Sequence, residues 1–216
     1  MTQQEWIREL AAGIGQLGLA IPSPAQSKLS AYIALLHKWN RTYNLTAVRE
    51  PGEMVSKHLL DSLAVAPFVR GPRVLDVGTG AGLPGIPLAI ALPEHYFILL
   101  DGNGKKTRFV TQAVTALGLK NVEVVQARAE DFRPAERFAT VLSRAFASLA
   151  DFLALTAHLG TPAGRWLAMK GARPDDELQA LPAGFRLLAV HLLNVPRLNA
   201  QRCVVEIEKQ VLRSGC

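Results

Sequence analysis

The sequence predicts an α/β protein in which a seven-stranded, mostly parallel, doubly wound sheet follows an N-terminal helical extension. Two observations support this fold class. From Arg73 onward, short β-rich runs alternate with helical segments, as expected for parallel strands joined by right-handed crossovers. The first run ends in three glycines at alternate positions, Gly78, Gly80 and Gly82, and a helical segment follows. Such a turn lets a ligand approach the backbone closely, and the helix start offers N–H groups to an anion.

Length and composition suit one core domain with a modest extension. The chain has 216 residues, of which 49% are hydrophobic, and we divide it into a helical extension (1–70) and a ligand-binding sheet domain (71–216). Its apolar runs are all shorter than a membrane span, and the first five residues lack the basic segment of a secretory signal. Cys203 and Cys216 suggest neither a metal cluster nor a disulfide framework. We therefore expect a cytoplasmic protein with no metal and no membrane partner.

The net charge of +6 suggests an anionic partner. The excess is spread evenly along the chain, because residues 1–70, 71–150 and 151–216 each carry a net charge of +2. A face for an anionic partner would therefore have to be assembled by folding.

The extension is predicted to open with two amphipathic helices. Thr2 and Glu5 match a capping box, and Gly18 ends the first helix. The second begins at Ser23. Residues at helical spacing give each helix one apolar face, formed by Trp6, Ile7, Leu10, Ile14 and Leu17 in the first and by Leu29, Tyr32, Ile33, Leu36 and Trp39 in the second. Because the aromatic residues share these faces with leucines, they are interpreted as core.

Residues 39–46 show no clear periodicity, and a third helix is predicted over about 52–69. His58 and Asp61 lie three residues apart in it, so they would share a face and could form a hydrogen bond. Spacing alone favours a pair on the helix surface over a functional site.

Seven β-rich runs supply the predicted strands, and the last two could pair as a terminal hairpin. They are residues 74–77, 96–100, 122–126, 140–143, 166–169, 185–193 and 203–208. Ligands of doubly wound sheets bind beyond the carboxyl ends of the strands. The residues after each run are therefore the candidates for a site.

The glycine turn can be interpreted in three ways. Gly80, Gly82 and Gly85 fit the dinucleotide fingerprint, but Gly78 already closes the strand, which argues against that assignment. A turn without a ligand is the second interpretation. The third is favoured: Asp76 followed by glycines at alternate positions resembles motif I of class I S-adenosylmethionine (SAM)-dependent methyltransferases, whose fold is Rossmann-like.

The next two strand ends add groups that suit the same cofactor. Asp101 ends the second run, where a carboxylate can accept hydrogen bonds from both ribose hydroxyls. Glu130 and Asp131 follow the third run, next to Ala129, where an adenine would lie. An ordered set of three strand ends is more specific than any one of its members.

The fourth and fifth strand ends suggest what kind of acceptor is used. The [DN]-P-P-[YFW] motif of exocyclic-amine methyltransferases is missing after the fourth run, and neither run is followed by a cysteine for covalent attack. Arg144 and Lys170 instead share the rim. Two cations there favour an anionic or carbonyl-bearing acceptor.

Seven segments together resemble one family, the bacterial ribosomal RNA small subunit methyltransferase G (glucose-inhibited division protein B) family. The resemblance covers nearly the whole chain and is loosest before about Leu29 and after Gly171. The segments are Y-N-L-T (43–46), H-L-L-D-S-L (58–63), D-V-G-T-G-A-G-L-P-G-I-P-L (76–88), L-D (100–101) with K-K-T-R (105–108), A-R-A-E (127–130), S-R-A (143–145) and M-K-G (169–171).

The resemblance implies methyl transfer from SAM to N7 of guanine 527 in 16S rRNA, within the small ribosomal subunit or an assembly intermediate. It implies cofactor contacts at Gly78, Leu83, Ala129, Glu130 and Arg144, with Gly80 and Gly82 in the same loop. Asp76 matches the position that supports the loop and Asp101 the position that holds the ribose. Asn44, His58, Arg144 and Lys170 match family positions around the acceptor.

Other functions stay open on the sequence alone. A methyltransferase of another RNA or of a small molecule would share the cofactor half, and a SAM-binding protein without activity would keep only the glycine loop. RNA phosphates could be contacted by basic residues, namely Lys38, Arg41, Arg49, Lys57, Lys105, Lys106 and Arg108. We expect a monomer, because the chain shows no coiled-coil heptads.

Overall fold

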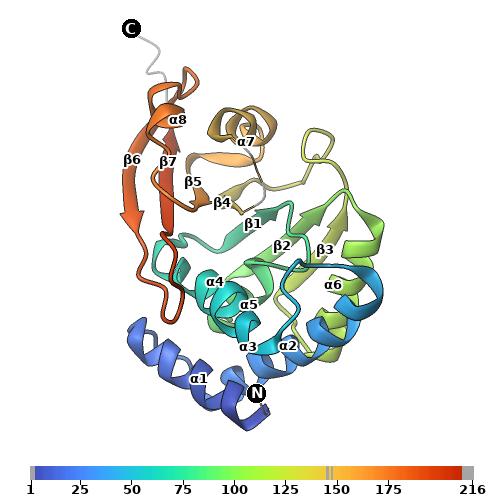
Figure 1. Cartoon of the computed structure of the whole chain (residues 1–216). Coiled ribbons are helices and arrows are strands. Elements are labelled where there is room, and N and C mark those ends of the chain that lie inside the picture. Colours follow the sequence, from blue (N-terminus) through green and yellow to red (C-terminus); the bar gives the residue numbers. More distant parts are fainter. Residues whose placement is uncertain (1–2, 145, 147, 211–216) are drawn as a thin grey trace, which may run out of the picture.

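The computed structural model describes residues 3–144, 146 and 148–210, and within them seven strands form one sheet (Figure 1). The strand order is β3-β2-β1-β4-β5-β7-β6. The strands are β1 (Arg73–Val77), β2 (Tyr96–Asp101), β3 (Val122–Gln126), β4 (Phe138–Ser143), β5 (Gly160–Lys170), β6 (Phe185–Leu192) and β7 (Cys203–Lys209). The predicted α/β fold class is confirmed.

The first five strands are parallel, and β7 and β6 add an antiparallel edge. β1 lies in the middle, with Leu75 aligned with Ile98 of β2 and Val141 of β4. β7 lies between β5 and β6, so the predicted terminal hairpin forms and also joins the sheet. The order reverses at β1 and β4, and the carboxyl ends of such neighbouring strands are where ligands bind.

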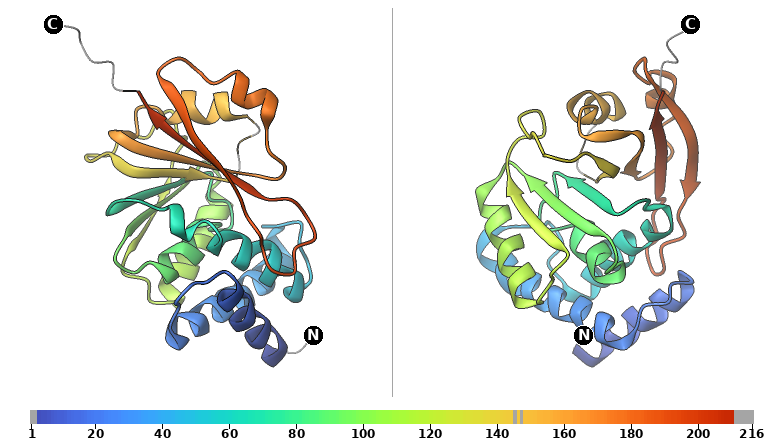
Figure 2. Two further views of the ribbon diagram at one scale, coloured as in Figure 1. Left: turned by 90° about the vertical axis from the view of Figure 1, so that its left-hand side faces the viewer. Right: turned by 180° about the vertical axis from the view of Figure 1, so that it is seen from behind.

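Helices cover both faces of the sheet (Figure 2). One face carries α5 (Gly85–Ala91), α6 (Gly104–Ala116) and the N-terminal helices; the other carries α7 (Leu149–Thr156). A short helix, α8 (Asp175–Gln179), contacts α7. Asn103 begins α6 by accepting hydrogen bonds from the amides of Lys105 and Lys106, and Ser148 begins α7 by accepting one from Asp151.

The extension starts with α1 (Gln3–Gln16) and α2 (Ser23–Tyr43). Most residues of the predicted apolar faces are buried, but Ile7 is 46% exposed, so the apolar face of the first helix is not buried along its whole length. α2 also includes residues 39–43, the first five of the segment predicted to lack periodicity, and is capped by Asn44, which has a left-handed backbone. Thr2 of the predicted capping box lies outside the described residues.

The predicted third helix is broken into four short pieces. They are α3 (Pro51–Met54), the π-helical turn η1 (Val55–Leu60), α4 (Asp61–Leu63) and the 3₁₀ turn η2 (Ala66–Phe68). A π turn adds a residue to the helical repeat and changes which side chains share a face. This is why the predicted pairing of His58 with Asp61 does not form.

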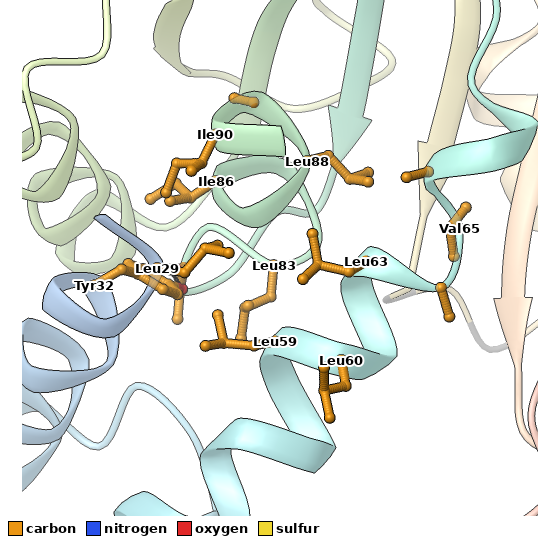
Figure 3. Packing of buried hydrophobic residues seen from close by; sticks show 14 of the residues in the cluster. Leu29, Tyr32, Leu59, Leu60, Leu63, Val65, Leu83, Ile86, Leu88 and Ile90 are labelled. Atoms are coloured by element: carbon orange, nitrogen blue, oxygen red, sulfur yellow. Dashed lines mark hydrogen bonds between the residues drawn. The ribbon is translucent and has the colours of Figure 1, made fainter. Parts of the chain in front are cut away.

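The extension and the sheet share one hydrophobic core. Leu29 and Tyr32 of α2 lie with Leu59, Leu63 and Ile86 in one buried cluster, which Figure 3 shows from close by. The division at residue 70 thus remains a prediction about domains and is not a boundary of the core. Among the described residues, the helices are all too short or too polar to cross a membrane.

Candidate active site

The glycine turn after β1 is held from below by Asp76. This carboxylate is fully buried, and its Oδ2 accepts hydrogen bonds from the Thr79 hydroxyl at 2.6 Å and the Gly85 amide at 2.9 Å. Burial raises the pKa of Asp76 to about 6, although these two hydrogen bonds act in the opposite direction. Asp76 therefore lies under the loop, in the supporting position that the sequence predicted for it.

A cavity of about 250 Å³ opens at the carboxyl ends of β1, β2 and β3. It brings together four of the predicted cofactor residues: Gly78, Asp101, Ala129 and Glu130. We call this space the adenosine cavity, after the part of the cofactor that the sequence predicts there. Its remaining lining residues are Val77, Leu100, Gly102, Ala127, Arg128, Phe146 and Leu155.

Asp101 is the fixed carboxylate of the adenosine cavity. Its Oδ2 accepts the Gly80 amide and its Oδ1 accepts the Asn103 amide, both at 2.8 Å. A carboxylate oxygen has two acceptor positions, so each oxygen keeps one for a further donor such as a ribose hydroxyl. Gly80 thus contributes to the site by holding Asp101.

The glycine loop is also tied to the N-terminal extension. The fully buried Tyr32 of α2 donates its hydroxyl hydrogen to the Ala81 carbonyl at 2.7 Å. Burial raises the pKa of Tyr32 above its ordinary value, so the phenol keeps the proton that it donates. The prediction that Tyr32 is a core residue is confirmed, and its contact with the loop was not foreseen.

Two predicted cofactor residues lie against the core instead of lining the adenosine cavity. Gly82 has a φ of +88°, and a Cβ there would meet Ile86 Cδ1 at 2.5 Å. Leu83 is 3% exposed and packs in the cluster with Leu59 and Leu63 (Figure 3). Gly82 and Leu83 therefore support the glycine loop by packing against the core.

A second, polar cavity of about 350 Å³ lies beside the ends of β4 and β5. It brings together Arg144 and Lys170, the two cations predicted on the rim, and we call it the basic cavity. Lys57 and Arg202 line it as well, from η1 and from the segment before β7. Lys170 is paired with Glu177, whose two carboxylate oxygens lie at 2.9 and 3.0 Å from Nζ.

The Asp61 carboxylate contacts both arginines of the basic cavity. Its side chain is only 3% exposed; Oδ2 lies 3.3 Å from Arg144 Nη1, and Oδ1 accepts a hydrogen bond from Arg202 Nε at 3.0 Å. The prediction that Asp61 belongs to a surface pair is therefore wrong. A buried carboxylate between two arginines fixes both guanidinium groups at one wall.

His58 and Asn44, predicted around the acceptor, do not line the basic cavity. His58 is buried, and its Nε2 lies 2.9 Å from the Thr46 hydroxyl, so it too is not a surface residue. Asn44 is exposed at the end of α2, and its Oδ1 accepts a hydrogen bond from Arg49. Both residues contact the connection between α2 and α3. Ala145 of the S-R-A segment lies outside the described residues.

His58 should make the protein less stable in mild acid. Burial and the nearby charge of Arg144 lower its pKa to about 4 from an ordinary value of 6.5. Between pH 6.5 and 4, His58 is therefore protonated in the unfolded chain but neutral in the folded protein. The contribution of His58 to the free energy of unfolding is present in full above pH 6.5 and is lost as the pH falls toward 4. Between pH 7 and 4, the free energy of unfolding should fall by about 3 kcal/mol more for the wild type than for His58→Gln.

Urea unfolding of both proteins at several pH values would check this. The difference between the two isolates His58, because groups such as Asp76 are present in both proteins. If the free energy of unfolding changed with pH by the same amount in both proteins, His58 would not titrate in this way.

Several residues of the site escaped the sequence analysis. Phe146 and Arg128 line the adenosine cavity within segments already singled out, so inspection of their neighbours could have found them. The acid at position 61 was a weak signal, because it interrupts an apolar run. Arg202 and Glu177 gave no signal, since only the folded chain brings them to Asp61 and Lys170.

Comparison with known proteins identifies close relatives over most of the chain. A model of the family described as rRNA small subunit methyltransferase G matches residues 25–205. A protein of Stutzerimonas stutzeri named ribosomal RNA small subunit methyltransferase G is 57% identical over 204 residues, covering 94% of this chain and 95% of its own. A Pseudomonas aeruginosa protein of the same name is 56% identical, covering 90% and 91%.

Solved structures agree with the fold. TrmN from Thermus thermophilus is 25% identical with a TM-score of 0.57, over 79% of this chain and 53% of its own. The glycopeptide N-methyltransferase MtfA, solved with S-adenosylhomocysteine, is similar in fold at 13% identity, with a TM-score of 0.61 over 71% of this chain and 87% of its own. The family match and the identities above carry the assignment: the chain belongs to the rRNA small subunit methyltransferase G family.

Proposed function

We propose that this protein transfers a methyl group from SAM to N7 of guanine 527 in 16S rRNA, on the small ribosomal subunit or an assembly intermediate. The observation that carries the proposal is that neighbouring residues after β4 line two different cavities. Phe146 lines the adenosine cavity and Arg144 lines the basic cavity, two residues apart in the chain. A cofactor site and an acceptor site would therefore share one short wall.

The adenosine cavity suits the nucleoside half of SAM. Asp101 would accept the ribose hydroxyls with the oxygen positions that its backbone partners leave free. The Phe146 ring and the Ala129 backbone would border the adenine, and Gly78 would border the rest of the cofactor. When bound, SAM supplies an electrophilic methyl group on a sulfonium.

The acceptor atom explains why a general base is not required. Guanine N7 has a free lone pair and no proton, so the enzyme has no proton to remove before transfer. The protein's main task is to orient the two reactants and exclude water. The methylated ring becomes cationic while O6 remains an acceptor, and a cavity with arginine and lysine donors suits O6 and the nearby phosphates better than an acidic one would.

We assign Arg144 to orienting the cofactor and the acceptor edge, and Lys170 to guanine O6 or an adjacent phosphate. Both side chains border the basic cavity. Asn44 and His58 would act from the connection between α2 and α3, which they hold through Arg49 and Thr46.

The target guanine must leave its helix or lie in a distorted region. N7 faces the deep, narrow major groove of A-form RNA, which side chains cannot reach. Basic residues around the site would hold the phosphates, so binding should weaken steeply as salt rises. Lys57 already lines the basic cavity. We further propose that the enzyme is a cytoplasmic monomer that works without a membrane.

The decisive experiment is transfer of labelled methyl from SAM to small subunits prepared without this modification. Aniline scission then maps N7-methylguanosine in the RNA. One new cut at guanine 527 would establish acceptor, atom and activity together. SAM binding without transfer to subunits or rRNA would overturn the proposal and favour a small-molecule acceptor or a protein that only binds SAM.

A further inference from the structure

The carboxylate of Glu177 contacts both Lys170, which lines the basic cavity, and the start of α7, three residues after Phe146 of the adenosine cavity. It lies on α8, and its Oε2 accepts the Leu149 amide at 2.6 Å while both oxygens pair with Lys170 Nζ. Leu149 begins α7, directly after the segment that carries Arg144 and Phe146. One side chain thus holds both the first residue of α7 and a cation that lines the basic cavity.

The contact is partly shielded from water. The side chains of Lys170 and Glu177 are 13% and 28% exposed, so their pairing is screened less than that of a surface ion pair. The Leu149 amide is one of the N–H groups without a partner inside its own helix, and Glu177 satisfies it. The same helix start is capped independently by Ser148, whose hydroxyl oxygen accepts the Asp151 amide.

We propose that Glu177 is a positioning residue that couples cofactor binding to acceptor binding. Acting through the Leu149 amide, it holds the start of α7 and thereby positions Phe146, three residues earlier, at the adenosine cavity. Acting through Lys170, it fixes the ammonium group that faces the acceptor. The assignment of the acceptor side rests on the proposed function, whereas the assignment of the cofactor side does not.

Two substitutions separate these roles. Glu177→Ala removes both contacts, so KM for SAM should rise and kcat on small subunits should fall, each by about tenfold. Glu177→Gln keeps an oxygen for the Leu149 amide but loses the charge that holds Lys170. KM for SAM should therefore return to within about twofold of the wild type, while kcat stays several-fold lower.

Asp176→Ala is the matched control, because Asp176 is exposed on the same short helix. It should leave both parameters unchanged. If Glu177→Ala behaved like this control, or if the alanine and glutamine variants changed both parameters equally, the proposal would be overturned. If the alanine variant fails to fold, the glutamine variant alone tests the acceptor side, and a kcat equal to that of the wild type would overturn the proposal.

Calorimetric SAM affinity keeps this test separate from that of the proposed function. If wild-type protein binds SAM but transfers no methyl to subunits, the proposed acceptor is wrong. A weaker affinity in Glu177→Ala that Glu177→Gln restores would still support the cofactor side of the coupling. Equal SAM affinities in all variants would exclude a role of Glu177 in cofactor binding.

Discussion

Replacing Gly82 by alanine is expected to destabilise the protein by about 3 kcal/mol. Two costs add at this position. The φ of +88° lies in the region that disfavours a side chain, and the new Cβ would come within 2.5 Å of Ile86 Cδ1, in the core beneath the loop. Chemical denaturation of the variant, compared with the wild type, measures the loss.

Gly80→Ala is the matched control within the same loop. Gly80 also has a positive φ, of +61°, but the nearest atom to its Cβ would be the Gly78 carbonyl oxygen at 3.9 Å. It should cost only the backbone term, about 1–2 kcal/mol. Equal losses in the two variants would mean that packing against Ile86 contributes nothing.

Removing the Arg144 side chain should abolish most of the methyl transfer. With Arg144→Ala, kcat on small subunits is expected to fall about 100-fold at saturating SAM, because a fixed donor group beside the reacting atoms is lost. Asp61 would keep Arg202 as a partner, so the fold should survive. Rates of labelled methyl transfer, together with a melting curve, would measure both effects.

Arg8→Ala provides the comparison for charge alone, since Arg8 is exposed on α1. It removes the same charge from the molecule and should leave kcat near the wild-type value. Full turnover by Arg144→Ala under saturating conditions would refute the role assigned to this arginine.

The cofactor half of the site could be predicted because its geometry follows a local rule. Parallel strands that neighbour one another end at the same edge, so the residues after β1, β2 and β3 had to meet there. Gly78, Asp101 and Glu130 do line one cavity. Asp76 could be assigned to loop support through the resemblance to motif I, and its partners Thr79 and Gly85 do follow within nine residues.

The acceptor half could be predicted only in part. Arg144 follows β4, Lys170 ends the adjacent parallel strand β5, and both line the basic cavity. The carboxylate that holds Arg144, however, comes from Asp61 at the start of α4. Helical periodicity misassigned that region, since the π turn over Val55–Leu60 shifts which side chains face inward. Arg202 reaches Asp61 across 141 residues, a distance that no local pattern describes.

The hydrogen bond from Tyr32 to Ala81 ties the extension to the glycine loop, and it would therefore link the extension to binding of the proposed cofactor. The shape of the loop depends on a helix 49 residues earlier in the chain. A ligand that binds only the ordered loop must also stabilise the helix that orders it, by linkage. Opening of α2 and release of SAM would then be coupled, so the stability of the extension would depend on whether SAM is bound.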